Sequence, residues 1–253
     1  MVSQVRTIPV VFVSFTVALG AVGFSAGLQV GNAGTEVSQP QETTPGVEAR
    51  ADRILREMGE YLASAGEFTF RADVTYDSVL TTGQKIEYGG TADVAVRRPD
   101  QLRSDYNGDE RQSQAVYDGQ TITLYDMAVN VYAVAEVPPE IDAAVDQVFE
   151  SYGFSVPIAD LVYSDPYRVL IEYVESGFWV GRHSVDGTPC HHLAFSQDSI
   201  DWQIWIEDGP WPVPRKLVIT YKQEAGAPKP KNACLGLKRF LVHSPPCENT
   251  KSS

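Results

Sequence analysis

Apolar and polar residues alternate with a period of two through the middle of the chain, which is typical of antiparallel β-strands. Between residues 92 and 134, short alternating runs follow one another, and polar reversals at 107–110 and 118–119 separate them. Such strands present one apolar face to a core and one polar face to water. The pattern favours a binding fold, because no set of acid, base and nucleophile accompanies it.

The same alternation predicts further strands on both sides of this block. A long strand at 68–76 precedes it, and residues 85–88 lead into it. Later in the chain, turn sequences such as Asp186-Gly187 separate more alternating runs. Strands are therefore also expected at 178–183, 190–195, 202–206 and 216–221.

Two longer segments instead show the helical period of 3.6 residues. The first spans 47–65, with Gly66 placed to stop it, and its apolar stripe consists of Ile54, Leu55, Met58, Tyr61 and Leu62. The second opens with Pro138-Pro139 and ends before Gly153, and its stripe consists of Ile141, Ala144, Val145, Val148, Phe149 and Tyr152. Two shorter helices are expected at 157–162 and 166–173.

This order of elements predicts a mainly β (α+β) fold. Successive hairpins form an antiparallel sheet, which its own twist curves. The amphipathic helices can bury their apolar stripes only against the concave face of that sheet. We therefore expect a curved antiparallel half-barrel whose helices plug the concave face and enclose an apolar cavity.

Residues 1–33 differ from the rest of the chain and predict a cleaved signal peptide. Arg6 is the only charge before a long apolar run, and small residues end that run. A retained transmembrane anchor is the alternative, because the run is long for an export signal. No cysteine ends the run, which argues against a lipid anchor. Residues 34–46 are polar and contain two prolines, as expected of a disordered spacer.

The chain is strongly acidic, with a formal net charge of −13. Such a charge disfavours nucleic acid and anionic membrane surfaces as partners. The exception is a basic tail at 229–253, which follows the predicted domain at 47–228. Residues 239–243 are either the last strand of the sheet or part of a tail foreign to the fold. Cys234 and Cys247 either pair with each other or stay unpaired, and Cys190 is left as a free thiol.

Several blocks of the sequence resemble known families. Residues 91–103, which contain Arg98-Pro99, and residues 116–126, which contain Asp118-Gly119, resemble periplasmic lipoprotein carriers of the LolA/LolB type. Residues 186–195, 201–209 and 214–217 are similar to an uncharacterised family of predicted periplasmic proteins that shares this fold. Together the resemblance covers about residues 47–221.

The resemblance implies a hydrophobic cavity that accepts acyl chains. In such carriers an arginine can latch the helical lid to the sheet, and Arg98 matches its position, with a partner that the sequence does not identify. Candidate cavity-lining residues come from the apolar faces of the helices and strands: Ile54, Leu55, Met58, Phe70, Val94, Ile122, Leu124, Val148, Phe149, Trp202 and Ile204. Plain core packing is the alternative for these side chains.

Reactive side chains do not form a recognisable site in the sequence. His191 and His192 are adjacent on a predicted strand, so they point to opposite faces and cannot share one metal ion. The sequence contains neither a phosphate-binding P-loop nor a Rossmann fingerprint. We therefore predict no enzyme activity, no metal site and no cofactor.

These patterns together predict an exported periplasmic protein that binds a hydrophobic ligand in the cavity between the curved sheet and the helices. A carrier of that ligand is one role that such binding would serve. The expected ligand is a lipid or the acyl chain of a lipoprotein. An envelope interaction or sensor protein, whose cavity is filled by its own helices, is the alternative. The expected partners are a lipid, an acylated protein or an envelope protein, with no nucleic acid, and we expect a monomer.

Overall fold

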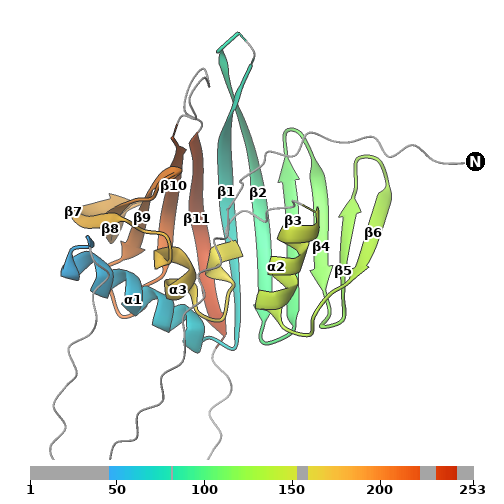
Figure 1. The fold of residues 1–253 in the computed structure, drawn as a ribbon, viewed down its shortest axis with the longest axis horizontal. Helices are drawn as coiled ribbons and strands as arrows, with labels where there is room; N and C mark the ends of the chain where they lie inside the picture. Colours follow the sequence, from blue (N-terminus) through green and yellow to red (C-terminus); the bar gives the residue numbers. More distant parts are fainter. Residues whose placement is uncertain (1–45, 81, 153–158, 223–231, 244–253) are drawn as a thin grey trace, which may run out of the picture.

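One curved antiparallel sheet forms the body of the protein. The structure, a computed structural model, describes residues 46–80, 82–152, 159–222 and 232–243. Within these ranges the sheet has 11 strands in the order β6-β5-β4-β3-β2-β1-β11-β10-β9-β8-β7 (Figure 1). The strands are β1 (Glu67–Val79), β2 (Lys85–Arg97), β3 (Gln101–Gly108), β4 (Gln112–Tyr117), β5 (Thr121–Asp126), β6 (Val131–Glu136), β7 (Ser176–Val185), β8 (Thr188–Ser196), β9 (Ile200–Glu207), β10 (Pro214–Tyr221) and β11 (Asn232–His243).

The sheet consists of two meanders that β11 joins. Strands β1 to β6 pair in sequence order on one side, and β7 to β10 pair in sequence order on the other. β11 lies between β1 and β10, where Phe68 of β1 opposes Val242 and Leu217 of β10 opposes Leu235. The segment that the sequence left open is therefore a central strand, and the sheet extends beyond residue 228, the end of the predicted domain.

Three helices of the described residues lie on one face of this sheet. α1 (Ala49–Ser64) and α3 (Pro166–Ile171) cover the part that contains β9, β10 and β11, and α2 (Ile141–Tyr152) lies over β3 and β4 (Figure 1). α3 begins where the Asp165 carboxylate accepts a hydrogen bond from the Arg168 backbone N–H, 3.0 Å away. This bond satisfies a donor that the first helical turn otherwise leaves free.

The predicted helices agree with these elements, and one is shorter than expected. The helices predicted at 47–65 and after Pro139 are α1 and α2, and the one predicted at 166–173 is α3. The described part of the helix expected at 157–162 is a single 3₁₀ turn, η1 (Ala159–Leu161). The predicted signal peptide and nearly all of the predicted spacer lie outside the described residues.

Burial confirms alternating apolar and polar faces on the central strands. On β1, Phe68, Phe70 and Ala72 are buried against the helices, whereas Arg71 between them is exposed. On the opposite face, Arg71 makes an ion pair with Asp93 of β2 at 2.6 Å. The concave face is thus apolar and the convex face carries charges, which confirms the predicted half-barrel with helices over its concave side.

Candidate functional site: the interior between sheet and helices

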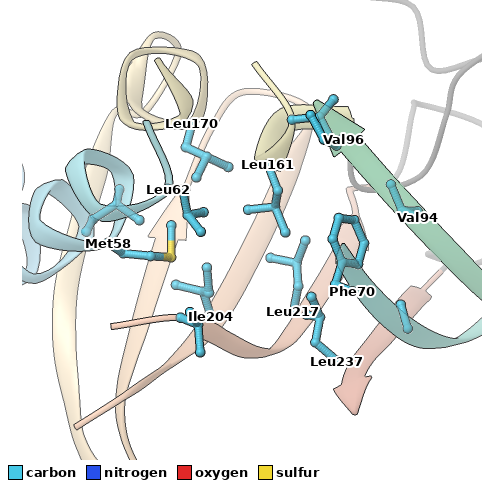
Figure 2. Close-up of a cluster of buried hydrophobic side chains, with 14 of the residues drawn as sticks. Met58, Leu62, Phe70, Val94, Val96, Leu161, Leu170, Ile204, Leu217 and Leu237 are labelled. Atoms are coloured by element: carbon cyan, nitrogen blue, oxygen red, sulfur yellow. The ribbon is translucent and has the colours of Figure 1, made fainter. Parts of the chain in front are cut away.

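Side chains from seven strands and helices, and from the 3₁₀ turn, meet between the sheet and its helical cover. Figure 2 shows them pointing toward one another, and all are at most 7% exposed. We call these residues the interior cluster: Met58, Leu62, Phe70, Val94, Val96, Leu161, Leu170, Ile204, Leu217 and Leu237. They come from α1, β1, β2, η1, α3, β9, β10 and β11. Because all of them are apolar, this interior offers dispersion and hydrophobic contacts and no reacting group.

Most of the predicted lining residues belong to the same core. Trp202 and Ile204 lie on β9, Phe70 and Val94 on β1 and β2, and each is at most 5% exposed. Four more come from helices, namely Ile54, Leu55, Met58 and Val148. Ile122 packs against this core while partly exposed, whereas Leu124 and Phe149 are half-buried outside it. Whether any of these side chains contacts a ligand stays a prediction.

Sequence reasoning missed several members of the interior cluster. Leu161 and Leu170 lie in elements of a few residues, which are too short to show a periodic stripe. Leu217 follows the period-two pattern of β10, so alternation alone was a sufficient signal for it. Leu237 lies in the basic tail, where the charge of the segment obscured the strand.

Arg98 joins the end of β2 to the segment between η1 and α3. Its Nη1 donates to the Val162 carbonyl and its Nη2 to the Tyr163 carbonyl, each at 2.7 Å. Burial lowers the pKa of Arg98, and the nearby charge of Asp142 opposes that effect. Both acceptors are backbone carbonyls, so no side chain in the sequence marks them as the partner of this arginine.

The segment that Arg98 binds also holds α2. The Tyr163 hydroxyl donates to Asp146 of α2 at 2.7 Å, and the Ser164 backbone N–H donates to Asp142 at 2.9 Å. At the start of α2, the Ile141 backbone N–H donates to the Pro99 carbonyl at 3.0 Å. Residues 162–164 are therefore a junction at which the sheet, α2 and the segment that leads into α3 are linked by polar contacts.

A second polar network fixes α1 to α3. The Asp52 carboxylate, on a residue only 2% exposed, accepts from the Tyr167 hydroxyl at 2.5 Å and from Arg56 at 3.2 Å. The two helices approach closely, because a Cβ added to Gly59 would lie 2.5 Å from the Tyr167 Cβ. A buried carboxylate with charge-assisted bonds holds this pair of helices in one arrangement.

Tyrosines replace aliphatic residues toward one end of the concave face. Along β1 the buried positions Phe68, Phe70 and Val74 lead to Tyr76, which is partly exposed. Tyr76 opposes Tyr88 of β2 in register, and their rings are 5.8 Å apart. The same end carries Tyr106 of β3, which is next to β2, and Tyr221 of β10, which β11 separates from β1. We call Tyr76, Tyr88, Tyr106 and Tyr221 the tyrosine rim.

The backbone makes room for one ring of this rim. A Cβ added to Gly90 would lie 2.6 Å from the Tyr106 hydroxyl, and one added to Gly108 would lie 2.5 Å from it. The Tyr106 ring therefore lies across two glycines of adjacent strands, with the Arg111 guanidinium 5.1 Å from its centroid. A side chain other than hydrogen at either position would displace this ring.

Asp160 of η1 influences the ionisation of two tyrosines, Tyr163 and Tyr221. Burial raises its pKa, and its charge in turn raises the pKa values of Tyr163 and Tyr221, in which burial is the larger cause. Tyr221 faces the concave side, because it continues the alternation of Leu217 and Ile219 on β10.

The histidines lie on opposite faces of β8, as the sequence predicts. His191 is 3.2 Å from Asp208, whereas the His192 Nδ1 is 3.0 Å from the His183 Nδ1. Within the described residues, no group of three or more His, Cys, Asp or Glu side chains is arranged to hold a metal ion. Cys190 and Cys234 are free thiols, and Cys247 lies outside the described residues.

No helix among the described residues has the length and apolar character needed to cross a membrane.

The fold and the interior define the class of this protein: an antiparallel half-barrel whose helices close over an apolar core. Residues 51–233 match the family described as predicted periplasmic protein (DUF2092), and the chain belongs to that family. This match confirms the predicted family and the predicted periplasmic localisation. No curated protein matches the chain.

Solved structures similar to this chain include mycobacterial and LolA-type proteins. LprF from Mycobacterium bovis shares 13% identity with a TM-score of 0.44, over 78% of this chain and 98% of that one. The lipoprotein LppX from Mycobacterium tuberculosis shares 13% identity with a TM-score of 0.46, over 76% and 94%. A LolA superfamily protein from Nitrosomonas europaea shares 10% identity with a TM-score of 0.33, over 78% and 94%.

Proposed function

We propose that this periplasmic protein binds a hydrophobic ligand, a lipid or the acyl chain of a lipoprotein, between the sheet and its helices, and acts as a carrier. The observation that carries the proposal is the interior cluster, which is formed only by apolar side chains of the sheet and its helical cover. An acyl chain that enters such a space gains about 0.8 kcal/mol for each buried methylene.

The polar junction at residues 162–164 supplies a way to open and close this interior. Arg98 bonds two carbonyls of that segment, and the same segment binds α2. If these bonds break, the cover separates from the end of β2 without disturbing the Asp52 network between α1 and α3. We therefore assign Arg98 the role of a latch, as the resemblance to carriers implies.

Uptake of a fluorescent fatty acid by the mature protein tests the binding function. Val94→Phe adds volume to the interior cluster, and we expect it to reduce uptake at least several-fold. Val134→Phe is the matched control, because Val134 is 55% exposed on β6 and its replacement leaves the interior unchanged. The proposal fails if the wild type takes up no probe and organic extracts of the purified protein contain no acyl species by mass spectrometry.

A second candidate function is an envelope interaction or sensor protein with a self-filled interior. It is favoured by the burial of the cluster itself, in which Met58 and Leu62 are 0% exposed and Ile204 is 1% exposed. In this case the fluorescent probe does not bind, whereas the protein captures a protein partner from solubilised envelopes. Cross-linking of the purified protein to envelope fractions, followed by mass spectrometry, distinguishes this function from lipid carriage.

A further inference from the structure

The two edges of the sheet are protected to different degrees. Residues 46–48 run along the outer side of β7, where the Glu48 backbone N–H donates to the Gly177 carbonyl at 2.8 Å. The Trp179 backbone N–H donates to the Glu48 carboxylate at 3.0 Å, and a bulge between Trp179 and Gly181 interrupts the register with β8. Covered backbone groups and bulges are features that prevent further strands from pairing with a sheet edge.

The strand at the opposite edge, β6, lacks this protection. It has no neighbour on its outer side among the described residues, and its pairing with β5 is regular throughout (Figure 1). Residues 131–136 contain neither lysine nor proline, which commonly protect an edge. Exposed apolar side chains lie on both faces of the strand, with Val131 on one face and Tyr132 and Val134 on the other. The outer edge of β6 can therefore accept a further strand.

The flank that ends in β6 is acidic and has no cation of its own. Residues 112–152 form β4, β5, β6 and α2, and they contain no lysine, arginine or histidine. Asp126 and Glu136 lie at opposite ends of the β5–β6 ladder. Within the described residues, no acid of this flank makes an ion pair. These acids are Asp118, Asp126, Glu136, Glu140, Asp142, Asp146 and Glu150.

The cations on the adjoining elements are engaged elsewhere. The Arg103 guanidinium of β3 binds Asp105 at 2.7 Å, and Arg111, just before β4, lies over the Tyr106 ring. Arg98 donates to the two carbonyls of the junction at residues 162–164. The negative charge beside β6 therefore attracts cationic groups and repels anionic ones.

We propose that β6 is a docking site for an extended, cationic segment of a partner protein, which adds to the sheet as a further strand. The segment pairs its backbone with the outward N–H and C=O groups of β6, and its basic residues lie near Asp126 and Glu136. A second copy of this chain fits less well, because it would bring two acidic flanks together. The proposal is independent of ligand binding in the interior, because no side chain of β6 belongs to the interior cluster.

Binding of labelled synthetic peptides to the full mature protein, measured by fluorescence anisotropy, tests this assignment. The probe is Lys-Val-Thr-Val-Thr-Val-Lys, and the comparison peptides are Glu-Val-Thr-Val-Thr-Val-Glu and Lys-Val-Thr-Pro-Thr-Val-Lys. We expect the first peptide to bind at least about tenfold more tightly than either comparison, because one reverses the charge and the other breaks the strand. Saturation with the first peptide should also slow hydrogen exchange of the backbone amides of residues 131–136.

Tyr132→Lys places a cation on the proposed edge, and it should weaken binding of the first peptide at least about tenfold. Phe178→Lys is the matched control, because it adds the same charge at an aromatic position on the other edge strand. Phe178 is 56% exposed and Tyr132 is 73% exposed, so neither change opens the core. Equal weakening in the two variants would show that total charge is responsible, and it would overturn the assignment to β6.

Three other results would also overturn the proposal. Equal affinity for the three peptides would exclude a charge-selective strand site. A dimer of the wild type that Tyr132→Lys dissociates would assign the edge to a second copy. Slow exchange of the β6 amides in the monomer without peptide would assign it to another segment of this chain. Absence of peptide binding together with normal fatty-acid uptake would leave the proposed function standing.

Discussion

The helices bury the two flanks of the sheet to different extents. Under α1 and α3, the flank with β8 to β10 is sealed: Leu193 and Ile206 are 0% exposed, as are Leu55 and Met58 of the helix above them. At the other edge, β6 is open, with Tyr132 73% exposed and Val131 and Val134 each 55% exposed. The first flank is therefore tightly packed. The second exposes apolar side chains of β6 that the described residues do not cover.

The helical covers of the two flanks are also attached differently. α1 and α3 share the buried Asp52 carboxylate and the close approach at Gly59. α2 packs Ile141, Ala144 and Val148 on the core, and its polar contacts, such as those of Asp142 and Asp146 with residues 163 and 164, are exposed. Exposed hydrogen bonds open at lower free-energy cost than packed ones. A cover that opens to admit a ligand is therefore expected to move at α2 and its junction.

Truncation of a side chain in the packed flank gives the largest expected effect. Ile204→Ala should lower the free energy of unfolding by about 2–5 kcal/mol, because it removes buried methylene groups and leaves a cavity. Val134→Ala on β6 should change it by less than about 0.5 kcal/mol. Urea denaturation followed by tryptophan fluorescence measures both. Similar losses in the two variants would show that the flanks do not differ in packing.

Removal of the latch is expected to have the next largest effect. Arg98→Leu leaves the Val162 and Tyr163 carbonyls without their donor, which costs about 1–3 kcal/mol for a buried polar group left unpaired. Arg97→Leu is a neighbouring control, because the Arg97 side chain is exposed and bonds only to Gln101 among the described residues. Arg98→Leu should also speed the release of a bound fluorescent fatty acid, measured by stopped-flow transfer to vesicles. Equal release rates in the two variants would contradict the latch.

The contact between α1 and α3 gives a third, smaller effect. Tyr167→Phe removes the hydroxyl that donates to Asp52, and it should lower the free energy of unfolding by about 1–2 kcal/mol. Tyr163→Phe removes one hydroxyl bond to Asp146 at the α2 junction and serves as the comparison. We expect that variant to lose less stability, because its bond is exposed. The reverse order, measured by denaturation, would place the rigid attachment at α2.

Much of the architecture follows from local pattern, and the departures have physical reasons. The stripes of α1 and α2 and the alternation of β9 are local signals, so Leu55, Val148 and Trp202 could be assigned to the core from sequence. β11 directly follows β10 along the chain, but its other partner, β1, is distant in the sequence, and no local pattern indicates that pairing. Its basic residues further obscured a strand whose Leu237 is buried.

The candidate site was harder to predict than the fold, for a related reason. Arg98 could be identified as a latch candidate, but its partners are the carbonyls of Val162 and Tyr163, and every residue has a carbonyl. The tyrosine rim consists of residues that are ordinary in strands, and only their position at one end of the folded sheet makes them a group.

The smallest expected effect is a pH dependence at His192 in the packed flank. His192 of β8 stacks on Trp205 at 3.9 Å, and burial lowers its pKa below the value of about 6.5 of an ordinary histidine. The unfolded chain therefore binds a proton at this residue before the folded protein does. The contribution of His192 to stability is complete above the unfolded pKa and decreases as the pH falls through it.

Denaturation midpoints measured between pH 7.5 and 5 should accordingly decline toward the acid end, by an amount below that of any variant above. His192→Gln should flatten part of this decline, since glutamine does not titrate. His191→Gln, on the opposite face of the same strand, should keep the contribution of His192. If both variants retain the full slope, the acid sensitivity arises outside β8, and the packed flank is no more sensitive to protonation than the open one.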